Sequence, residues 1–129
     1  MEDNKLKESK LFTPYKLGNI TLRNRTIRSA AFESMGDKFG PTQQLKDYHV
    51  SVAKGGIGMT TLAYAAVCRS GLSFDKQLWL RPEIVPGPKD ITDAVHQAGA
   101  AASIQIGHCG NMTHYSTAGQ IPIGPSTGI

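Results

Sequence analysis

The feature that most constrains the fold of this chain is an alternation of strand-like and helix-like segments. Residues 26–31, 57–63 and 101–106 are short runs compatible with β-strands, and the second and third carry no charge, which is typical of buried strands. Residues 42–54 and the segment after Pro86 carry apolar side chains at helical spacing. Because parallel strands joined by helices follow right-handed crossovers, this alternation predicts an α/β fold with a parallel sheet flanked by helices.

Glycines mark the ends of these segments. Gly18 and Asn19 form a turn signal within residues 15–25, which predicts a β-hairpin ahead of the first strand. Gly55 follows the first helical segment and Gly99 follows the second, in the position where glycine commonly ends a helix. The predicted order is therefore hairpin, strand, helix, strand, helix, strand.

Two architectures fit this order, a doubly wound sheet and a (β/α)₈ barrel. A complete barrel takes about 250 residues, whereas this chain has 129, and three strands with two helices leave most inner faces uncovered. Both architectures stay open on these grounds, and a barrel would be incomplete within residues 1–129. Residues 1–10 are expected to be disordered, and residues 112–129 are expected to form an irregular loop.

Composition and charge restrict the class of partner. Hydrophobic residues make up 40% and charged residues 19% of the sequence, as in folded soluble domains. No apolar run reaches the roughly 18 residues of a membrane span, and the charged N-terminal sequence lacks the apolar region of a signal peptide. We therefore expect a cytoplasmic protein that does not bind membranes. The net charge of +4 comes from scattered basic residues, which argues against nucleic-acid binding, while a homo-oligomer is allowed.

Cysteine and histidine spacing gives no metal site. Cys68 and Cys109 lie far apart in the sequence and form no CxxC pair, so free thiols are expected. His108 and His114 are the histidines that could join them around a metal ion, but their spacing is not that of zinc ligands. We expect no bound metal.

Three sequence blocks carry a family resemblance. The first is LFTPYKLGNITLRNRTIRSAAF at residues 11–32, in which an Asn-Arg pair leads into the first strand. The second is KGGIG at residues 54–58, and the third is ITDAVH at residues 91–96 followed by SIQIGHCG at residues 103–110. In order and spacing they resemble the N-terminal portion of the Old Yellow Enzyme family of NADH:flavin oxidoreductases, over roughly residues 10 to 111. The resemblance implies that residues 1–129 form a partial TIM (β/α)₈ barrel, made of the N-terminal hairpin, the first three strands and two helices.

The resemblance implies a bound FMN. In the family, residues at the end of the first strand border the isoalloxazine ring through backbone contacts, and the matching residues here are Ser29, Ala30, Ala31 and Phe32. Small side chains let a flat ring approach the backbone closely. The alternative is that these small residues only fill the tapering barrel interior. Phe32 stands where the family often has threonine or cysteine, so the flavin contact made by those residues is not expected here.

Gln105 and Tyr64 complete the predicted cofactor site. Gln105 lies near the end of the third strand, where barrel enzymes place their active sites, and its carboxamide offers a donor and an acceptor to a pyrimidine edge. The family uses the equivalent glutamine in this way; the alternative is a glutamine satisfied by neighbouring backbone. Tyr64 aligns with the family's glycine or alanine under the flavin, although its ring could instead enter a substrate pocket or pack. Asn111 stands where the family commonly has arginine.

The resemblance also implies an activity for an intact relative. Such an enzyme takes hydride from NADH or NADPH onto FMN and passes it to an activated alkene or an enoyl or dienoyl thioester, so the substrate is a small molecule. The family's catalytic and phosphate-binding segments come after residue 129, so no catalytic residue is assigned. The alternative is a truncated, inactive fragment without stable FMN binding.

Overall fold

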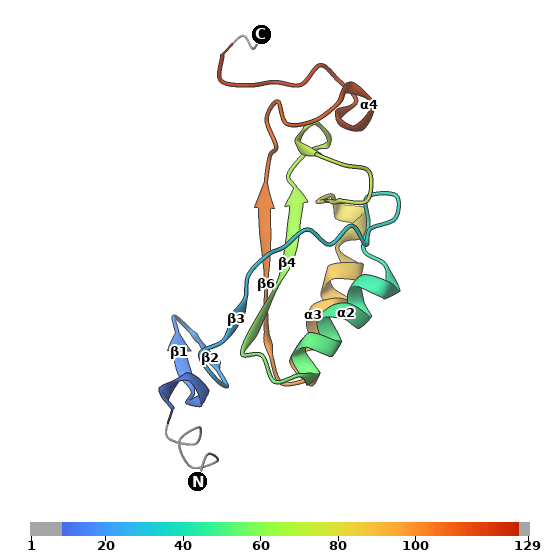
Figure 1. Ribbon diagram of the computed structural model, residues 1–129. Helices are drawn as coiled ribbons and strands as arrows, with labels where there is room; N and C mark the ends of the chain where they lie inside the picture. The colour runs from blue at the N-terminus through green and yellow to red at the C-terminus, as the bar shows by residue number, and fades with distance from the viewer. Residues whose placement is uncertain (1–8, 127–129) are drawn as a thin grey trace.

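The structure is a computed structural model, and it describes residues 9–126. Its centre is strand β4 (Met59–Ala66), which pairs in parallel with β6 (Ala101–Gly107) along one edge. The other edge of β4 pairs first with β3 (Ile27–Arg28) and then, near its end, with β5 (Leu78–Trp79), both in parallel. The carboxyl ends of β4 and β6 therefore point the same way, toward the C-terminal tail (Figure 1). The predicted parallel sheet is confirmed.

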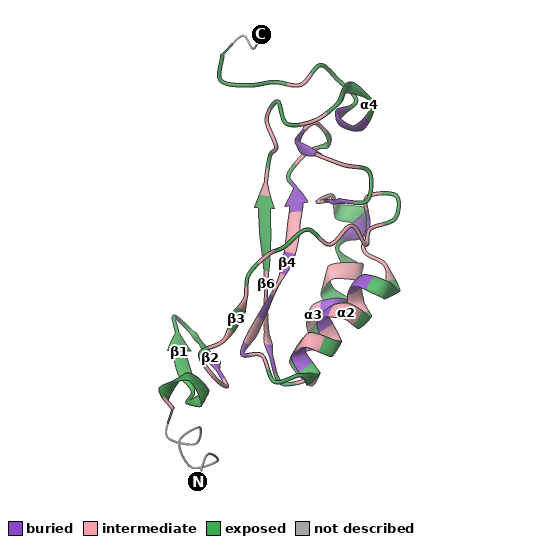
Figure 2. Cartoon of the chain, in the orientation of Figure 1, coloured by how far each residue is buried: buried purple, intermediate pink, exposed green. Residues whose placement is uncertain are grey.

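Two helices, α2 (Gln43–Lys54) and α3 (Pro86–Gln97), cover one face of this sheet (Figure 1). Their buried sides face β4, while the N-terminal hairpin and the carboxyl-terminal part of β6 are mostly exposed (Figure 2). The core between the layers consists of Leu45, Ala53, Leu62, Ala65, Leu78, Ile91, Val95 and Ala100. Because burying apolar surface stabilises by roughly 25 cal/mol per Å², this single interface between helices and sheet is the main source of stability.

Helix α2 begins and ends close to its predicted bounds, whereas α3 ends as predicted but begins at Pro86 itself rather than after it. The Thr42 hydroxyl accepts a hydrogen bond from the Leu45 N–H over 3.3 Å and caps the start of α2. Proline occupies the first position of α3, where its missing N–H costs nothing. Gly99 follows α3 with a φ of +88°, a conformation that glycine adopts without strain.

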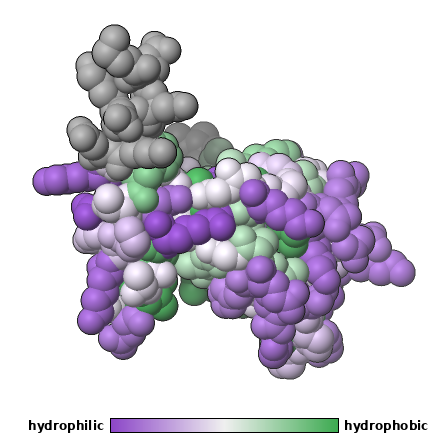
Figure 3. All heavy atoms as spheres, turned by 90° about the horizontal axis from the view of Figure 1, so that it is seen from below, coloured by the Kyte–Doolittle hydropathy of each residue, from purple (hydrophilic) through white to green (hydrophobic). Residues whose placement is uncertain are grey.

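The predicted hairpin is also confirmed. Strands β1 (Tyr15–Leu17) and β2 (Ile20–Leu22) pair antiparallel after a short 3₁₀ turn, η1 (Lys10–Phe12). Gly18 has a φ of 58° in the turn between them. The hairpin leaves apolar side chains exposed, including Leu17 and Ile20. Seen from below, apolar atoms show between hydrophilic side chains (Figure 3).

Several predicted boundaries were wrong. The first strand was expected over residues 26–31, but β3 ends at Arg28. Beyond it, the side chains of Arg28 and Glu33, rather than loop backbone, bond to β4. The second strand was expected to end at residue 63, but β4 continues through Ala66. The connection between β4 and α3 contains β5 and two 3₁₀ turns, η2 (Arg69–Gly71) and η3 (Pro82–Ile84).

The two ends of the chain are described in part. Residues 1–8 and 127–129 lie outside the described residues, so the disorder expected for residues 1–10 stays a prediction apart from the last two, which cap and start η1. The segment 112–129 was expected to be irregular, but it includes one helical turn, α4 (Tyr115–Ala118), closed by Gly119 in the left-handed conformation. Over residues 9–126, no helix has the length and apolar character needed to cross a membrane.

Candidate functional site

A cleft of about 240 Å³ opens at the carboxyl ends of β4 and β6. Five of the six predicted cofactor-binding residues line it: Ala30, Ala31, Phe32, Tyr64 and Gln105. The sixth, Ser29, is not among the lining residues; it is exposed, and its backbone carbonyl accepts a hydrogen bond from Arg28. The loop after β3, the end of β4 and the end of β6 therefore converge on one cavity, as the strand order predicts.

One wall of the cleft comes from a bulge in β4. The register with β6 shifts between Leu62 and Ala65, and both of these residues point into the core. The extra residue of a bulge re-aims neighbouring side chains. Ala63 and Tyr64, between them, line the cleft instead.

Tyr64 is held firmly in this wall. Its hydroxyl donates to the Gly71 carbonyl oxygen over 2.6 Å, and its own carbonyl accepts a hydrogen bond from the Gln77 side chain over 3.2 Å. A side chain at Gly107 would lie 3.2 Å from the Tyr64 ring, so the ring packs against the bare backbone of β6. Burial, with a smaller contribution from nearby Cys109, raises the pKa of the Tyr64 phenol above its ordinary value, which keeps the hydroxyl protonated as a donor.

Phe32 forms an aromatic pair at the edge of the cleft. Its ring centroid lies 4.5 Å from that of Phe74, with the planes tilted by 43°. Phe32 remains 75% exposed, and Ala31 is also exposed, so neither fills a packed interior in the described structure. The aromatic pair extends the apolar wall of the cleft outward.

Gln105 presents a free carboxamide. The side chain is exposed at the cleft and forms no hydrogen bond with any residue in the range 9–126. Within the described residues, neighbouring backbone therefore does not hydrogen-bond this amide, unlike in the alternative interpretation. Its donor and acceptor are available to a ligand in the cleft.

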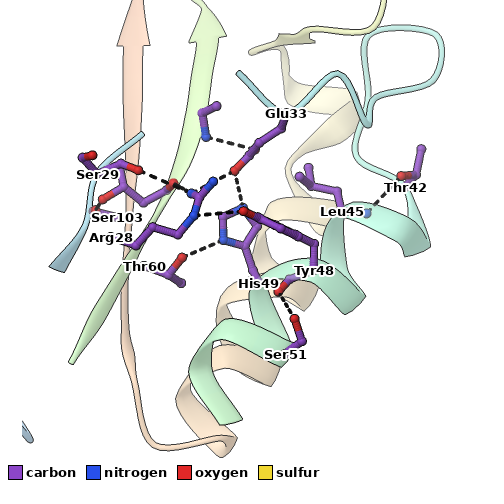
Figure 4. Close-up of polar contacts among 12 residues, drawn as sticks. Arg28, Ser29, Glu33, Thr42, Leu45, Tyr48, His49, Ser51, Thr60 and Ser103 are labelled. Atoms are coloured by element: carbon purple, nitrogen blue, oxygen red, sulfur yellow. Dashed lines mark hydrogen bonds and ion pairs between the residues drawn. The ribbon is translucent and has the colours of Figure 1, made fainter. Parts of the chain in front are cut away.

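Sequence reasoning missed one lining residue that organises this site, Glu33. Its side chain is only 6% exposed, and Oε1 lies 3.2 Å from Arg28 Nη1 and 2.9 Å from His49 Nε2. The contact to His49 has the distance of an ion pair but falls outside hydrogen-bond geometry. His49 is fully buried, and its Nδ1 lies 2.8 Å from the Thr60 hydroxyl. Figure 4 shows these side chains converging between α2 and the sheet. The available signal was a glutamate directly after the predicted flavin-contact segment, residues 29–32.

A second cluster of polar side chains lies beyond the carboxyl ends of β4 and β6. His108 Nδ1 accepts the Gly110 N–H over 2.9 Å, so in the neutral ring Nε2 carries the proton and donates to Ser70 Oγ at 3.1 Å. Ser70 Oγ in turn lies 3.1 Å from the Cys68 sulfur. Among the residues that the structure describes, no three His, Cys, Asp or Glu side chains gather in a way that could hold a metal ion.

Comparison with known proteins identifies the family. The sequence model of the NADH:flavin oxidoreductase / NADH oxidase family, whose cofactor is FMN, matches residues 10–127. The chain belongs to this family. Curated relatives include a 4,4'-dithiodibutanoate disulfide reductase of Rhodococcus erythropolis, 38% identical over 91% of this chain, and an NADPH dehydrogenase of Listeria welshimeri, 41% identical over 79% of it. The chain spans 29% and 31% of their lengths.

Solved structures confirm the fold. An old yellow enzyme homologue from Zymomonas mobilis superposes with a TM-score of 0.84 at 24% identity, over 93% of this chain and 34% of that one. Morphinone reductase gives a TM-score of 0.82 at 24% identity, over 92% of this chain and 33% of its own. The chain thus has the fold of about a third of an Old Yellow Enzyme barrel, as the sequence blocks predicted.

Proposed function

We propose that the cleft binds the isoalloxazine ring of FMN. The observation that supports this most strongly is the free Gln105 carboxamide, which faces a cavity also lined by Ala30 and Ala31. A flavin pyrimidine edge carries neighbouring donors and acceptors that a carboxamide can match. Ala30 and Ala31 have no side chain beyond Cβ, so a flat ring can approach their backbone. Phe32 and Tyr64 would flank the ring, while Ser29 supports the strand end from outside the cleft.

In a complete protein, this site would serve an FMN-dependent NAD(P)H oxidoreductase of the ene-reductase type. FMN, when bound, supplies the hydride-transfer chemistry. The residues described here would bind and orient the ring: Gln105 by hydrogen bonding, and Ala30 and Ala31 by close contact. The acceptor would be a small molecule with an activated alkene. This activity rests on family membership and on the geometry of the cleft.

A second candidate is a chain that holds no FMN by itself. The cleft of about 240 Å³ is smaller than the roughly 300–1,000 Å³ of typical ligand pockets, and barrels of this type usually bind phosphate with the loops after strands seven and eight. Purified chain that is yellow, with FMN-like absorbance, favours the binding unit. Colourless chain that takes up no added flavin favours the second candidate.

The test of the ring site is a flavin titration followed by fluorescence. We expect Gln105→Leu to weaken flavin binding at least about tenfold, because two ligand hydrogen bonds are lost. Gln97→Leu, at the exposed end of α3, is the matched control and should bind like the native chain. Equal affinities for the native chain and Gln105→Leu would contradict the proposed role of Gln105.

A further inference from the structure

A cluster of buried polar side chains lies beneath the cleft and joins the loop after β3 to β3, α2 and β4. Glu33 comes from the loop after β3, Arg28 from β3 itself, and His49 from α2 (Figure 4). While Glu33 Oε1 contacts Arg28 and His49, Oε2 accepts the backbone N–H of Ala63 in β4 over 3.1 Å. Each of the four segments that meet here contributes one partner.

The burial of Glu33 is not explained by a gain in stability. Removing a carboxylate from water costs several kcal/mol, and buried ion pairs often stabilise a fold no better than apolar residues of the same size. Glu33 could point outward from a surface loop, yet only 6% of its side chain is exposed. The cluster is better explained by the single geometry that it imposes on the loop.

That geometry is visible along one edge of β4. β3 pairs with β4 only as far as Thr60, and β5 takes up the same edge from Ala65. Between these points, the Thr61 carbonyl accepts a hydrogen bond from Arg28 Nη1 over 3.1 Å, and the Ala63 N–H donates to Glu33. Side chains thus replace a paired strand, and the backbone of residues 29–32 is held off the edge by the length of a side chain.

We propose that Glu33 is the positioning residue of the cleft. Its carboxylate, clamped by Arg28 and His49, sets the separation between the loop wall that contains Phe32 and the β4 wall that contains Ala63. The length of the Glu33 side chain, more than its charge, then determines whether a ring fits between the two walls. The binding part of the test rests on the proposed function; the exchange part does not.

Two variants separate length from charge. Glu33→Gln keeps the length and an oxygen that can accept the Ala63 N–H, whereas Glu33→Asp keeps the charge and is one methylene shorter. Hydrogen exchange of the Ala63 amide should stay close to native in Glu33→Gln and rise at least about tenfold in Glu33→Asp. The Leu62 amide in the same strand serves as the internal reference. Riboflavin affinity should follow the same order, with Glu33→Asp weaker at least about tenfold.

Glu83 offers matched controls. Its side chain is 73% exposed, and its Oε2 lies 3.8 Å from Arg81 Nε. Glu83 does not line the cleft. Glu83→Gln and Glu83→Asp should leave both readouts at native values. The opposite order, with Glu33→Asp native-like and Glu33→Gln impaired, would overturn the inference, as would Ala63 exchange that is unchanged in both Glu33 variants.

The two proposals fail in different ways. If the native chain binds no flavin, the ring site fails, and the order of Ala63 exchange rates still decides the role of Glu33. If the native chain binds riboflavin and both Glu33 variants bind it equally well, the positioning role fails and the ring site stands.

Discussion

Arg23 Nε donates to the carbonyl oxygen of Ile57 over 2.9 Å, directly before β4 begins. The same guanidinium donates to the carbonyls of Ala53, at the end of α2, and of Ala98, just after α3. Carbonyl groups in the last turn of a helix lack partners within the helix, so one side chain from the hairpin satisfies both helix ends. This side chain fixes the hairpin to the amino end of the sheet, opposite the cleft.

Replacing Arg23 should therefore destabilise the whole chain. We expect Arg23→Met to lower the free energy of unfolding by about 2–3 kcal/mol, because partly buried carbonyls lose a charged donor. Arg25→Met is the control: Arg25 is exposed and stacks at 5.1 Å on the Tyr15 ring, a contact that contributes about 0.5–1 kcal/mol. Urea unfolding measures both, and equal losses in the two variants would show that the helix-end contacts contribute little.

Tyr64 should make stability depend on pH in the alkaline range. Its folded-state pKa is raised from 10.0 by burial, so the unfolded chain loses this proton first as the pH rises. The native state then binds more protons than the unfolded state, so the free energy of unfolding falls as the pH rises above about 10. Below about pH 10, Tyr64 makes no pH-dependent contribution to this free energy. Tyr64→Phe should remove that alkaline fall.

The same variant should lose stability at neutral pH. The hydrogen bond to the Gly71 carbonyl is absent in Tyr64→Phe, which costs about 0.5–1.5 kcal/mol. Tyr115→Phe, at a 66% exposed position, controls for the loss of a surface hydroxyl. Urea unfolding between about pH 7 and about pH 11 tests both effects. A Tyr64→Phe chain with an unchanged alkaline slope would contradict the effect of burial on this phenol.

The sequence predicted the elements that have a local signal. The repeat of Leu45, Tyr48 and Val52, with Gly55 after it, identifies α2 without tertiary information. β5 could not be found in this way, because a strand of two residues shows no periodicity. Leu78 and Trp79 form a strand only through their pairing with β4. The end of β4 was missed for a related reason, since alanines have a low intrinsic preference for strands.

The site was predicted less completely than the fold. Gln105 and Ala30 were found from their places at strand ends, and both line the cleft. Glu33 was missed because glutamate is almost never buried unless paired. Its neighbour His49 lies 16 positions later in the sequence, and the contact between the two side chains forms only in the folded chain. Ser29 does not line the cleft, and its predicted contact with the flavin stays a prediction.

The open edge of β6 should make the chain self-associate. Within residues 9–126, β6 pairs only with β4, and Ile106 on this strand is 58% exposed. An unprotected edge with apolar side chains recruits further strands, so we expect oligomers that grow with concentration and an unfolding transition whose midpoint depends on chain concentration, unlike that of an independent two-state monomer. Light scattering should show Ile106→Lys shifted toward monomer, whereas Ile123→Lys, at a 53% exposed site in the tail, should leave association unchanged. A native chain that is monomeric and unfolds in one cooperative step would contradict the partial-barrel interpretation.

The most direct measurement of the central claim compares FMN with riboflavin by NMR titration of the native chain. If the chain supplies only the ring-binding part of a flavin site, FMN and riboflavin should bind with affinities within about threefold of each other. A contact to the FMN phosphate would add at least one charge-assisted hydrogen bond and make FMN bind more tightly. Both should shift the Gln105 side-chain amide and the backbone amides of Ala30, Ala31 and Phe32, which line the cleft. Binding without shifts at these residues, or FMN binding far more tightly than riboflavin, would contradict the claim.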